Sequence, residues 1–511
     1  MPTYIAALDV GTTGGRTIIF DLDGKEIARH YEEWNSIYPS PVMVEQQAGA
    51  WWNAMKGTTS GALKKGKINP RDIVGVACTN QRETIVPVDK DGKPLANALV
   101  WQDRRTIEEC NIIREKVGQD LIYKKTGLTI DPYFSASKIL WFKRHQPDIY
   151  AKTYKFLLVH DFILHKLTGQ FITDYTNASR TMLFDINSLK WSEEIASAIE
   201  LDLDKMPEAV PPGKAIGKIT MKDTGGFTTD TTAVAGAGDQ QAAALGVGVV
   251  DKGKIKCTTG TGSFILNHLD HPQLDSKKRV LCSCHADGKW VQEASIFTSG
   301  AVYRWVRDTI GKPECEIAQE REVDPYNIMN DLAKSSPVGA NGLILIPHFI
   351  GAGAPYWNPL ARGILFGLSL GHTRSDLYRA VMEGVAFEVR INLEVFREQG
   401  STPQELRVTG GGSRSDIWNQ IMADVCGIPI KRGELEESTA IGAAILAAYG
   451  TGQFTDIKTA ANKIAIMSKV WEPNAPTRQK YDDLYKLSRK LITTLAEANI
   501  YVELEKIRGN S

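Results

Sequence analysis

Short apolar runs separated by polar turns define the first thirty residues of the chain. Residues 4–8 and 16–20 are apolar runs, and a loop of Asp, Gly and Thr at 9–15 joins them. A second turn, Asp-Leu-Asp-Gly at 21–24, leads into another extended segment at 25–31. Runs of this length, bounded by Gly and Asp, predict three strands joined by two turns.

A related pattern occurs near the middle of the chain. A short strand-like run at 254–257 is followed by Thr-Thr-Gly-Thr-Gly-Ser at 258–263 and by the apolar run 264–266. One Gly/Thr turn in each half indicates two similar domains, with chance repetition of a short motif as the alternative. The small residues of segment 236–251 suit close packing and a hinge, so we place the domain boundary near residues 246–253.

Helical periodicity marks several segments of the second half. Residues 375–399 carry apolar side chains at helical spacing, with Ser375 and Asp376 as the expected cap. The Ala-rich segment 439–449 predicts a short helix ended by a glycine, and residues 481–499 predict a terminal helix. Strands that alternate with helices predict an α/β layered fold.

Length and charge restrict the class of protein. A chain of 511 residues predicts two or more domains. Its 60 basic and 60 acidic residues cancel, which argues against a dedicated nucleic-acid binder. No apolar run is long enough to span a membrane, and the N-terminal residues show no signal-peptide pattern. The seven cysteines are scattered, which is typical of reduced thiols, so we expect a cytoplasmic protein.

Two motifs suggest special chemistry but favour a structural role. Cys282-Ser283-Cys284-His285 contains potential metal ligands, yet no second Cys/His pair follows at zinc-finger spacing. His348 lies in an apolar run and is predicted to be a core histidine.

Three Gly-rich turns carry the signature of phosphate binding. The chain has no Walker A loop and no dinucleotide-binding fingerprint. Instead, Gly-rich turns at 11–15, 260–262 and 410–412 can present backbone N–H groups to phosphate oxygens. Thr12, Thr13 and Thr261 add hydroxyl donors, and Arg16 offers a fork of donors to a terminal phosphate. Asp9, at the end of the first strand, is the expected ligand of a hydrated Mg²⁺.

Two long motifs identify a resemblance that covers almost the whole chain. They are the decapeptide YFSASKILWF at 133–142 and a pattern from GILFGL at 363–368 to AVME at 380–383. With these motifs the chain resembles the FGGY carbohydrate kinases, members of the actin, hexokinase and Hsp70 fold group. The resemblance implies two actin-like (ribonuclease H-like) α/β ATPase domains with a cleft between them. It implies a polyol-binding domain at 1–247 and a nucleotide-binding domain at 248–511.

The first half resembles the glycerol kinases within this family, through NQRET at 80–84, VWQDRRT at 100–106, DPYF at 131–134 and GDQQ at 238–241. The resemblance implies an apolar wall formed by Trp101 and Phe264, and it implies polyol contacts from Arg82, Glu83, Tyr133, Asp239 and Gln240. It also implies that Asp239 is the general base that takes the proton from the substrate hydroxyl. From the residues alone, Asp239 is equally well a helix cap. The residues alone favour a surface ion pair for Arg82 and Glu83 and an ordinary core position for Trp101.

The second half is more similar to the xylulokinases, for example in GGGSRSD at 410–416 and YDDLY at 481–485. The resemblance implies ATP and Mg²⁺ as cofactors. The implied nucleotide-binding residues are Thr12, Thr13, Gly14, Arg16, Thr261, Gly300, Arg304, Gly411, Gly412 and Asp416. Gly14 and Gly15 stand where glycerol kinases commonly carry two serines, so one hydroxyl donor to phosphate is missing.

Together these observations predict an enzyme that uses ATP and Mg²⁺ to convert glycerol to sn-glycerol 3-phosphate, with domain closure over the substrates. The alternatives are a kinase for a ketopentose, xylulose or ribulose, or for another polyol. A more remote alternative is a non-catalytic nucleotide switch on the same fold. The expected partners are the polyol and ATP, with no nucleic acid and no membrane insertion, and the resemblance suggests a homo-oligomer, either a dimer or a tetramer.

Overall fold

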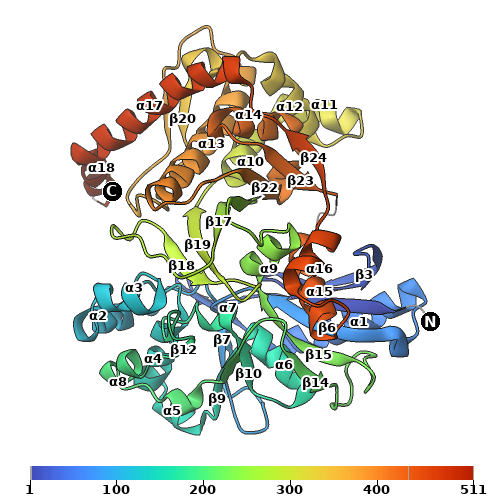
Figure 1. Ribbon diagram of the computed structural model, residues 1–511. Coiled ribbons are helices and arrows are strands. Elements are labelled where there is room, and N and C mark those ends of the chain that lie inside the picture. The colour runs from blue at the N-terminus through green and yellow to red at the C-terminus, as the bar shows by residue number, and fades with distance from the viewer. Residues whose placement is uncertain (1–2, 435–436, 510–511) are drawn as a thin grey trace. The chain divides into compact units, whose positions relative to one another are not determined.

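The computed structural model describes residues 3–434 and 437–509, shown as ribbons in Figure 1. The chain forms two compact units. The first consists of the residues up to Val250 together with His268–Val291 and Glu437–Ile466, and the second of the other described residues. The chain leaves the first unit inside the segment where we place the boundary, but two later segments return to that unit, so neither unit is one continuous stretch.

A six-stranded sheet forms the centre of the first unit. The three strands predicted at the N-terminus are confirmed. The order is β14-β15-β6-β1-β2-β3, with bounds β1 (Tyr4–Val10), β2 (Gly14–Asp21), β3 (Glu26–Glu33), β6 (Ile73–Asn80), β14 (Ala215–Lys218) and β15 (Thr232–Gly238). Strand β1 is antiparallel to β2 and parallel to β6, and β6 is parallel to β15.

This register brings three strand ends to one edge of the sheet. Val10 lies opposite Asn80, and Asn80 lies opposite Gly238. The loops that follow β1, β6 and β15 therefore begin side by side, as in other sheets with parallel strands. Each of these loops carries residues that the sequence predicts to be functional.

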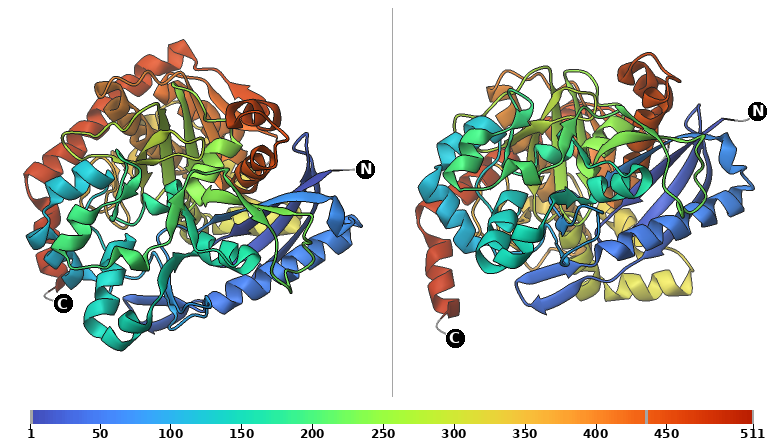
Figure 2. Two further views of the ribbon diagram at one scale, coloured as in Figure 1. Left: turned by 60° about the horizontal axis from the view of Figure 1, so that its bottom comes forward. Right: turned by 90° about the horizontal axis from the view of Figure 1, so that it is seen from below.

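Helices cover the six-stranded sheet. The apolar core joins β1 and β6 to α1 (Ala48–Gly66) and α6 (Val159–Thr168), and Figure 2 shows α1 running along β2 and β3. Helices α9 (Asp239–Gly246) and α15 (Ser438–Gly450) pack against each other, and α15 also contacts β1, β6 and β15. A Cβ at Gly246 would collide with the carbonyl of Ser438, and one at Gly442 with that of Ala242. The predicted close packing of this small-residue segment is confirmed.

The rest of the first unit surrounds this sheet. A five-stranded sheet has the order β4-β5-β8-β7-β9, with bounds β4 (Ile37–Ser40), β5 (Met43–Gln46), β7 (Ile85–Val88), β8 (Ala98–Leu99) and β9 (Lys155–Leu158). The other elements are α2 (Ile107–Lys116), α3 (Gln119–Thr126), α4 (Ser135–His145), α5 (Pro147–Lys152), β10 (Ile172–Asp174), α7 (Tyr175–Ala178), β11 (Phe184–Asp185), β12 (Lys190–Trp191), α8 (Glu193–Ala198), β13 (Glu208–Val210), β18 (Leu281–Cys284) and α16 (Ile457–Ile464).

The sheet of the second unit repeats the arrangement of the first. The strands of this unit have the order β19-β17-β16-β22-β23-β24, with bounds β16 (Lys254–Thr259), β17 (Ser263–Leu269), β19 (Trp290–Ile296), β22 (Glu405–Thr409), β23 (Ile430–Gly433) and β24 (Met467–Trp471). Strand β16 is antiparallel to β17 and parallel to β22, and β22 is parallel to β23. Each unit thus begins with a hairpin closed by a Gly/Thr turn, followed by parallel strands, which confirms the predicted similarity of the two domains.

The helices of the second unit differ from the sequence prediction at their ends. They are α10 (Gly300–Thr309), α11 (Lys312–Glu320), α12 (Pro325–Ser335), α13 (Arg374–Glu398), α14 (Asp416–Cys426), α17 (Ala475–Glu497) and α18 (Ile500–Gly509), with short strands β20 (Ile344–Ile346) and β21 (Ile364–Phe366). The cap of α13 is Thr373, which forms a capping box with Asp376, so the expected cap at Ser375 is wrong. Helix α17 starts at Ala475, before the predicted start at residue 481, and α18 follows it.

The remaining predictions concern single side chains. Cys282 and Cys284 lie on β18 within a buried apolar cluster, and all seven cysteines carry free thiols. His348 is buried, as predicted, and its Nε2 lies 3.2 Å from a carboxylate oxygen of Glu388.

None of the helices in the described part of the chain combines the length and the apolar character needed to cross a membrane.

Candidate active site

Three charged residues meet where β6 and β15 end. Arg82 and Glu83 follow β6, and Asp239 follows β15. Arg82 Nε lies 3.4 Å from Asp239 Oδ1 and 3.9 Å from Glu83 Oε1. Arg82 and Glu83 are only 3% and 1% exposed, so the surface ion pair considered from the sequence is wrong. Burying a charged group costs free energy unless it has a partner of opposite charge. The buried guanidinium and carboxylate at this strand end therefore form a preorganised polar site.

Asp239 is the first residue of α9, and the helix cap is Gly238 rather than Asp239. The side chain of Asp239 is 33% exposed. Its Oδ1 accepts a hydrogen bond from the backbone N–H of Gln240 at 2.7 Å. Negative charge is favourable at a helix N-terminus. The structure therefore orients this carboxylate through Oδ1 and leaves a third of the side chain exposed.

Arg180 is a member of this site that the sequence did not suggest. Its guanidinium is buried, and its Nε donates to Glu83 Oε1 at 2.6 Å. The same guanidinium lies over the rings of Phe134 and Tyr133, at 5.1 and 5.7 Å from their centres. The available signal was weak: Arg180 is the only charged residue between Tyr175 and Phe184.

Gln241 is a second residue that the sequence analysis missed. Its buried Oε1 accepts from Arg82 Nη1 at 3.2 Å, and its Nε2 donates to Ser283 Oγ at 3.2 Å. Gln240, which the resemblance implies as a polyol contact, is only partly buried. The two neighbouring glutamines therefore have different environments, because successive residues of a helix point about 100° apart.

Backbone strain accompanies the site at Glu83. Its φ of 62° lies in the left-handed region that non-glycine residues rarely adopt. The backbone N–H of Thr84 donates to the carbonyl of Arg82, which closes a tight turn. Strained backbone of this kind is concentrated at functional sites, where the surrounding contacts hold it.

Aromatic rings flank the charged residues. The rings of Trp101 and Tyr133 meet edge to face at 5.5 Å, and Tyr133 meets Phe134 at 5.2 Å. Trp101 is only partly buried, so it is not an ordinary core residue. Its indole N–H donates to Thr12 Oγ1 at 3.1 Å, which links this wall to the loop after β1. Phe264 lies on β17 in the other unit and is partly buried there.

Lys138, on α4, holds the loop that carries Tyr133. Its buried ammonium donates to the carbonyl of Tyr133 at 3.2 Å and, at shorter range, to that of Pro132. Burial lowers the pKa of Lys138 to about 8, although Asp103 and Glu83 oppose this effect.

We expect this burial to appear as a pH-dependent stability. Between pH 8 and pH 10.5 the unfolded chain holds a proton on Lys138 that the folded protein has lost, so stability rises with pH across this window. Relative to Lys138→Met, the free energy of unfolding of the wild type should rise by at most about 3 kcal/mol over this range. The measurement is the difference in Tm between the two proteins as a function of pH, with Lys116→Met at an exposed position as the control. A difference that stays constant with pH would show that Lys138 keeps its proton.

Asp9, on β1, fits the ligand chemistry of Mg²⁺. Its Oδ2 accepts from Arg16 Nε at 2.9 Å and from Thr439 Oγ1 at 3.0 Å. Among the residues that the structure describes, none donates to Oδ1. A hydrated Mg²⁺ needs one or two carboxylate oxygens, so Oδ1 suits that ion. Arg16 also pairs with Glu437 at 2.5 Å, so a phosphate would have to compete with this carboxylate for the guanidinium.

The loop after β1 is tight. The N–H of Gly11 donates to the carbonyl of Gly14 at 3.0 Å, and Thr13 is exposed while Thr12 is partly buried. A Cβ on Gly14 would collide with the hydroxyl of Tyr31 and the carbonyl of Glu32. This collision gives a physical reason for glycine at this position.

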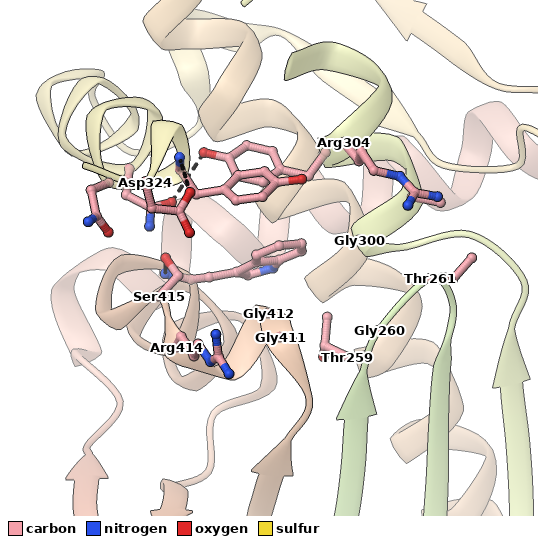
Figure 3. Close-up of a pocket in the computed structure, with 16 residues that line it drawn as sticks. Thr259, Gly260, Thr261, Gly300, Arg304, Asp324, Gly411, Gly412, Arg414 and Ser415 are labelled. Carbon is pink, nitrogen blue, oxygen red and sulfur yellow. Dashed lines mark hydrogen bonds between the residues drawn. The ribbon is translucent and has the colours of Figure 1, made fainter. Parts of the chain in front are cut away.

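A pocket of about 330 Å³ lies within the second unit, a volume that suits a small-molecule ligand (Figure 3). It contains five of the predicted nucleotide-binding residues: Thr261, Gly300, Arg304, Gly411 and Gly412. The other lining residues are Thr259, Gly260, Ala301, Tyr303, Asp324, Tyr326, Asn327, Asn330, Arg414, Ser415 and Trp418. Figure 3 shows Arg304 and Thr261 on one side, with Arg414 and Ser415 on the other. The Gly-rich turns after β16 and β22 thus share one pocket, whereas the turn at 11–15 does not line it, and nucleotide binding by these turns stays a prediction.

Aromatic side chains form a wall of this pocket that the sequence analysis missed. Tyr303 and Tyr326 stack at 5.5 Å, and Trp418 meets Tyr303 edge to face at 5.4 Å. The indole N–H of Trp418 has no hydrogen-bond partner among the described residues. Asp416 does not line the pocket; its carboxylate pairs with Lys469 at 2.8 Å, and the neighbouring Ser415 lines the pocket instead.

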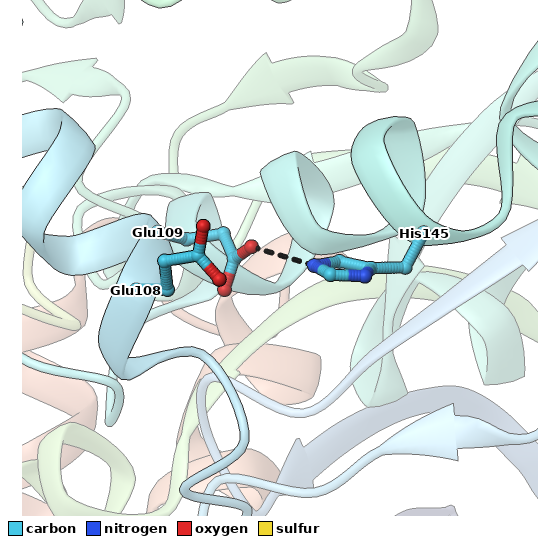
Figure 4. A group of neighbouring side chains, drawn as sticks. All are labelled: Glu108, Glu109 and His145. Atoms are coloured by element: carbon cyan, nitrogen blue, oxygen red, sulfur yellow. Dashed lines mark hydrogen bonds and ion pairs between the residues drawn. The ribbon is translucent and has the colours of Figure 1, made fainter.

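A separate cluster of potential metal ligands lies on α2 and α4. The ligand atoms of Glu108, Glu109 and His145 lie within 4.8 Å of one another (Figure 4). Arg144 forms ion pairs of 2.5 Å with both carboxylates. The guanidinium already pairs with both carboxylates, and a metal ion would have to displace it.

Comparisons with known proteins identify relatives over almost the whole chain. The curated glycerol kinase of Alkaliphilus oremlandii is 36% identical over 498 residues, which cover 95% of this chain and 96% of that protein. Glycerol kinase 2 of Thermotoga maritima is 35% identical over 489 residues, which cover 93% and 96%.

Solved structures show the same two-domain actin-like ATPase fold. The Plasmodium falciparum glycerol kinase with ADP matches with a TM-score of 0.86 and 25% identity, covering 96% of this chain and 98% of that one. The gluconate kinase of Lactobacillus acidophilus matches with a TM-score of 0.89 and 25% identity, covering 97% and 99%. Residues 4–246 match the N-terminal domain and residues 255–451 the C-terminal domain of the FGGY family of carbohydrate kinases. The chain therefore belongs to the FGGY family of carbohydrate kinases.

Proposed function

We propose that this enzyme transfers the terminal phosphate of ATP to glycerol and forms sn-glycerol 3-phosphate. The observation that carries the proposal is the convergence of Arg82, Glu83 and Asp239 at the edge of one sheet, with an aromatic wall beside them. The names of the relatives that match almost the whole chain support glycerol over a ketopentose.

Polyol binding follows from the donors and acceptors of this site. Arg82 donates, and Glu83 accepts through the oxygen that Arg180 does not hold, so adjacent hydroxyls find both kinds of partner. The aromatic wall of Trp101 and Tyr133 covers the carbon chain. A polyol that lacks one hydroxyl would leave a buried partner unpaired, at a cost of about 1–3 kcal/mol. This penalty gives the site its specificity.

Proton transfer is assigned to Asp239. Its carboxylate takes the proton of the terminal hydroxyl while the hydroxyl oxygen forms a bond to the terminal phosphorus of ATP. The bond from that phosphorus to the bridging oxygen breaks, and ADP leaves. A positioned general base of this kind typically contributes about 10²–10⁴-fold in rate, and the rest depends on alignment and charge neutralisation.

Nucleotide binding is assigned to the pocket of the second unit and to the loop after β1. The backbone N–H groups of Thr261, Gly262 and Gly411 suit phosphate oxygens, and the wall of Tyr326 and Trp418 suits the nucleoside. We assign Arg16 to the terminal phosphate. When Mg²⁺ is bound at Asp9, it neutralises phosphate charge.

The homo-oligomer and the cytoplasmic location stay predictions.

A substrate screen tests the proposal. Purified protein with ATP and Mg²⁺ is assayed for phosphate transfer to glycerol, erythritol, xylulose and ribulose, with acceptor-free ATP hydrolysis as the control. We expect the highest kcat/KM for glycerol. A kcat/KM for a pentulose well above that for glycerol would show that the substrate is a pentulose. Phosphate transfer to none of the four acceptors would favour the nucleotide switch.

A further inference from the structure

A buried polar network lies behind the strand that carries Asp239. The pairing of β14 with β15 ends at Val234, so the last residues of β15 have no strand on that side. The N–H groups of Gly236 and Gly238 instead donate to side chains, namely His160 Nε2 at 3.0 Å and Thr176 Oγ1 at 2.9 Å. Buried N–H groups need such acceptors. Here the acceptors hold Gly238, which directly precedes the base, and Gly236, which lies two residues before Gly238.

Asp174 fixes the hydroxyl that receives this bond. Asp174 is fully buried at the end of β10 and caps α7. Its Oδ1 accepts from the backbone N–H of Thr176 at 2.7 Å and, at shorter range, from the Thr176 hydroxyl. The hydroxyl proton is therefore directed at Asp174, and the oxygen lone pair is directed at the N–H of Gly238.

The other oxygen of Asp174 connects to the second strand of the site. Asp174 Oδ2 accepts from Asn177 Nδ2 at 2.5 Å. The side chains of Asn177 and Asn80 exchange two hydrogen bonds of 3.1 Å, and Asn80 also donates to the carbonyl of Gln81 at 2.6 Å. Asn80 is the last residue of β6, directly before the segment with Arg82. One carboxylate thus ties together the ends of both strands that carry the polyol residues.

His160 supplies the second arm of the network. Because its Nε2 accepts from Gly236, its proton lies on Nδ1, which is 3.1 Å from Asp161 Oδ1 and 3.7 Å from Asp174 Oδ2. Both His160 and Asp161 are fully buried.

We propose that Thr176, oriented by Asp174, and His160 are positioning residues that set the place of the Asp239 carboxylate relative to the acceptor hydroxyl. The inference rests on the proposed function, because it assigns these groups to the step that Asp239 performs. They touch neither substrate nor nucleotide, and they act through the backbone of β15. A misplacement of about 1 Å at a reacting group can lower a rate by about 10²-fold.

The test compares Thr176→Val with Thr176→Ser. Valine keeps the shape of threonine but leaves the N–H of Gly238 unpaired, whereas serine keeps the hydroxyl. We expect Thr176→Val to lower kcat by about 10- to 100-fold with less than about a threefold change in KM, and Thr176→Ser to stay within about twofold of wild type. Folding of each variant is followed by Tm and by circular dichroism.

Three outcomes would overturn the inference: a folded Thr176→Val enzyme with wild-type kcat, equal losses in both variants, or a change confined to KM. If Thr176→Val does not fold, His160→Leu is compared with His160→Gln, which keeps an acceptor for Gly236. A rate loss in the leucine variant alone supports the inference, and equal rates overturn it.

The assays use the best acceptor of the substrate screen, so a wrong assignment of glycerol is detected separately. A wild-type enzyme that phosphorylates no polyol overturns both proposals.

Discussion

Asp239→Asn should lower kcat for glycerol phosphorylation by about 10²–10⁴-fold, the contribution of a positioned general base. Asparagine has the shape of aspartate, and its Oδ1 can still accept from the N–H of Gln240, as the carboxylate does at 2.7 Å. It cannot take up a proton. The measurements are kcat by steady-state assay and glycerol affinity by calorimetry, and we expect the affinity to change much less than kcat.

The control for this variant is Asp223→Asn, which makes the same chemical change at a carboxylate that is 77% exposed and paired with Lys56. It should leave kcat unchanged. If Asp239→Asn turns over at the wild-type rate, Asp239 is not the base. A loss of affinity as large as the loss of kcat would instead show that Asp239 mainly binds the polyol.

The parts of the fold that follow from local chemistry could be predicted from the sequence. The Gly/Thr turn between β1 and β2 has its signal within a few residues, and so does the turn between β16 and β17. The apolar spacing of residues 375–399 predicted the helix that the structure shows as α13. Its cap was misplaced because Thr373, Ser375 and Asp376 are all favourable cap residues, and only the backbone distinguishes them.

The candidate site was only partly predictable because its contacts span long sequence separations. Arg180 and Glu83 are 97 positions apart, and Arg82 and Gln241 are 159 apart. Nothing in the local pattern around Arg180 indicates its partner. Lys138 lies inside a motif that the sequence analysis singled out, but its bonds to backbone carbonyls depend on how the preceding loop turns.

Arg180 also offers the strongest test of how the polyol site is held together. Replacement by methionine removes the closest ion-pair partner of Glu83, at 2.6 Å. The next guanidinium nitrogen, Arg82 Nε, lies 3.9 Å from the Glu83 carboxylate. Removing one partner of a buried ion pair typically costs about 3–5 kcal/mol, because it leaves an uncompensated buried charge. We expect Arg180→Met to lower Tm by about 10 °C and to raise the KM for glycerol.

A second substitution separates the buried charge from lost packing. Adding Glu83→Gln to Arg180→Met removes the unpaired charge, so the double variant should recover part of the lost Tm. It should not recover glycerol affinity, since we assign polyol binding to the carboxylate itself. Arg508→Met is the matched control: its side chain is 56% exposed and lies 3.8 Å from Glu505, and such surface pairs contribute little. A double variant less stable than Arg180→Met would show that the arginine acts through its packing on Phe134 and Tyr133 rather than through the charge of Glu83.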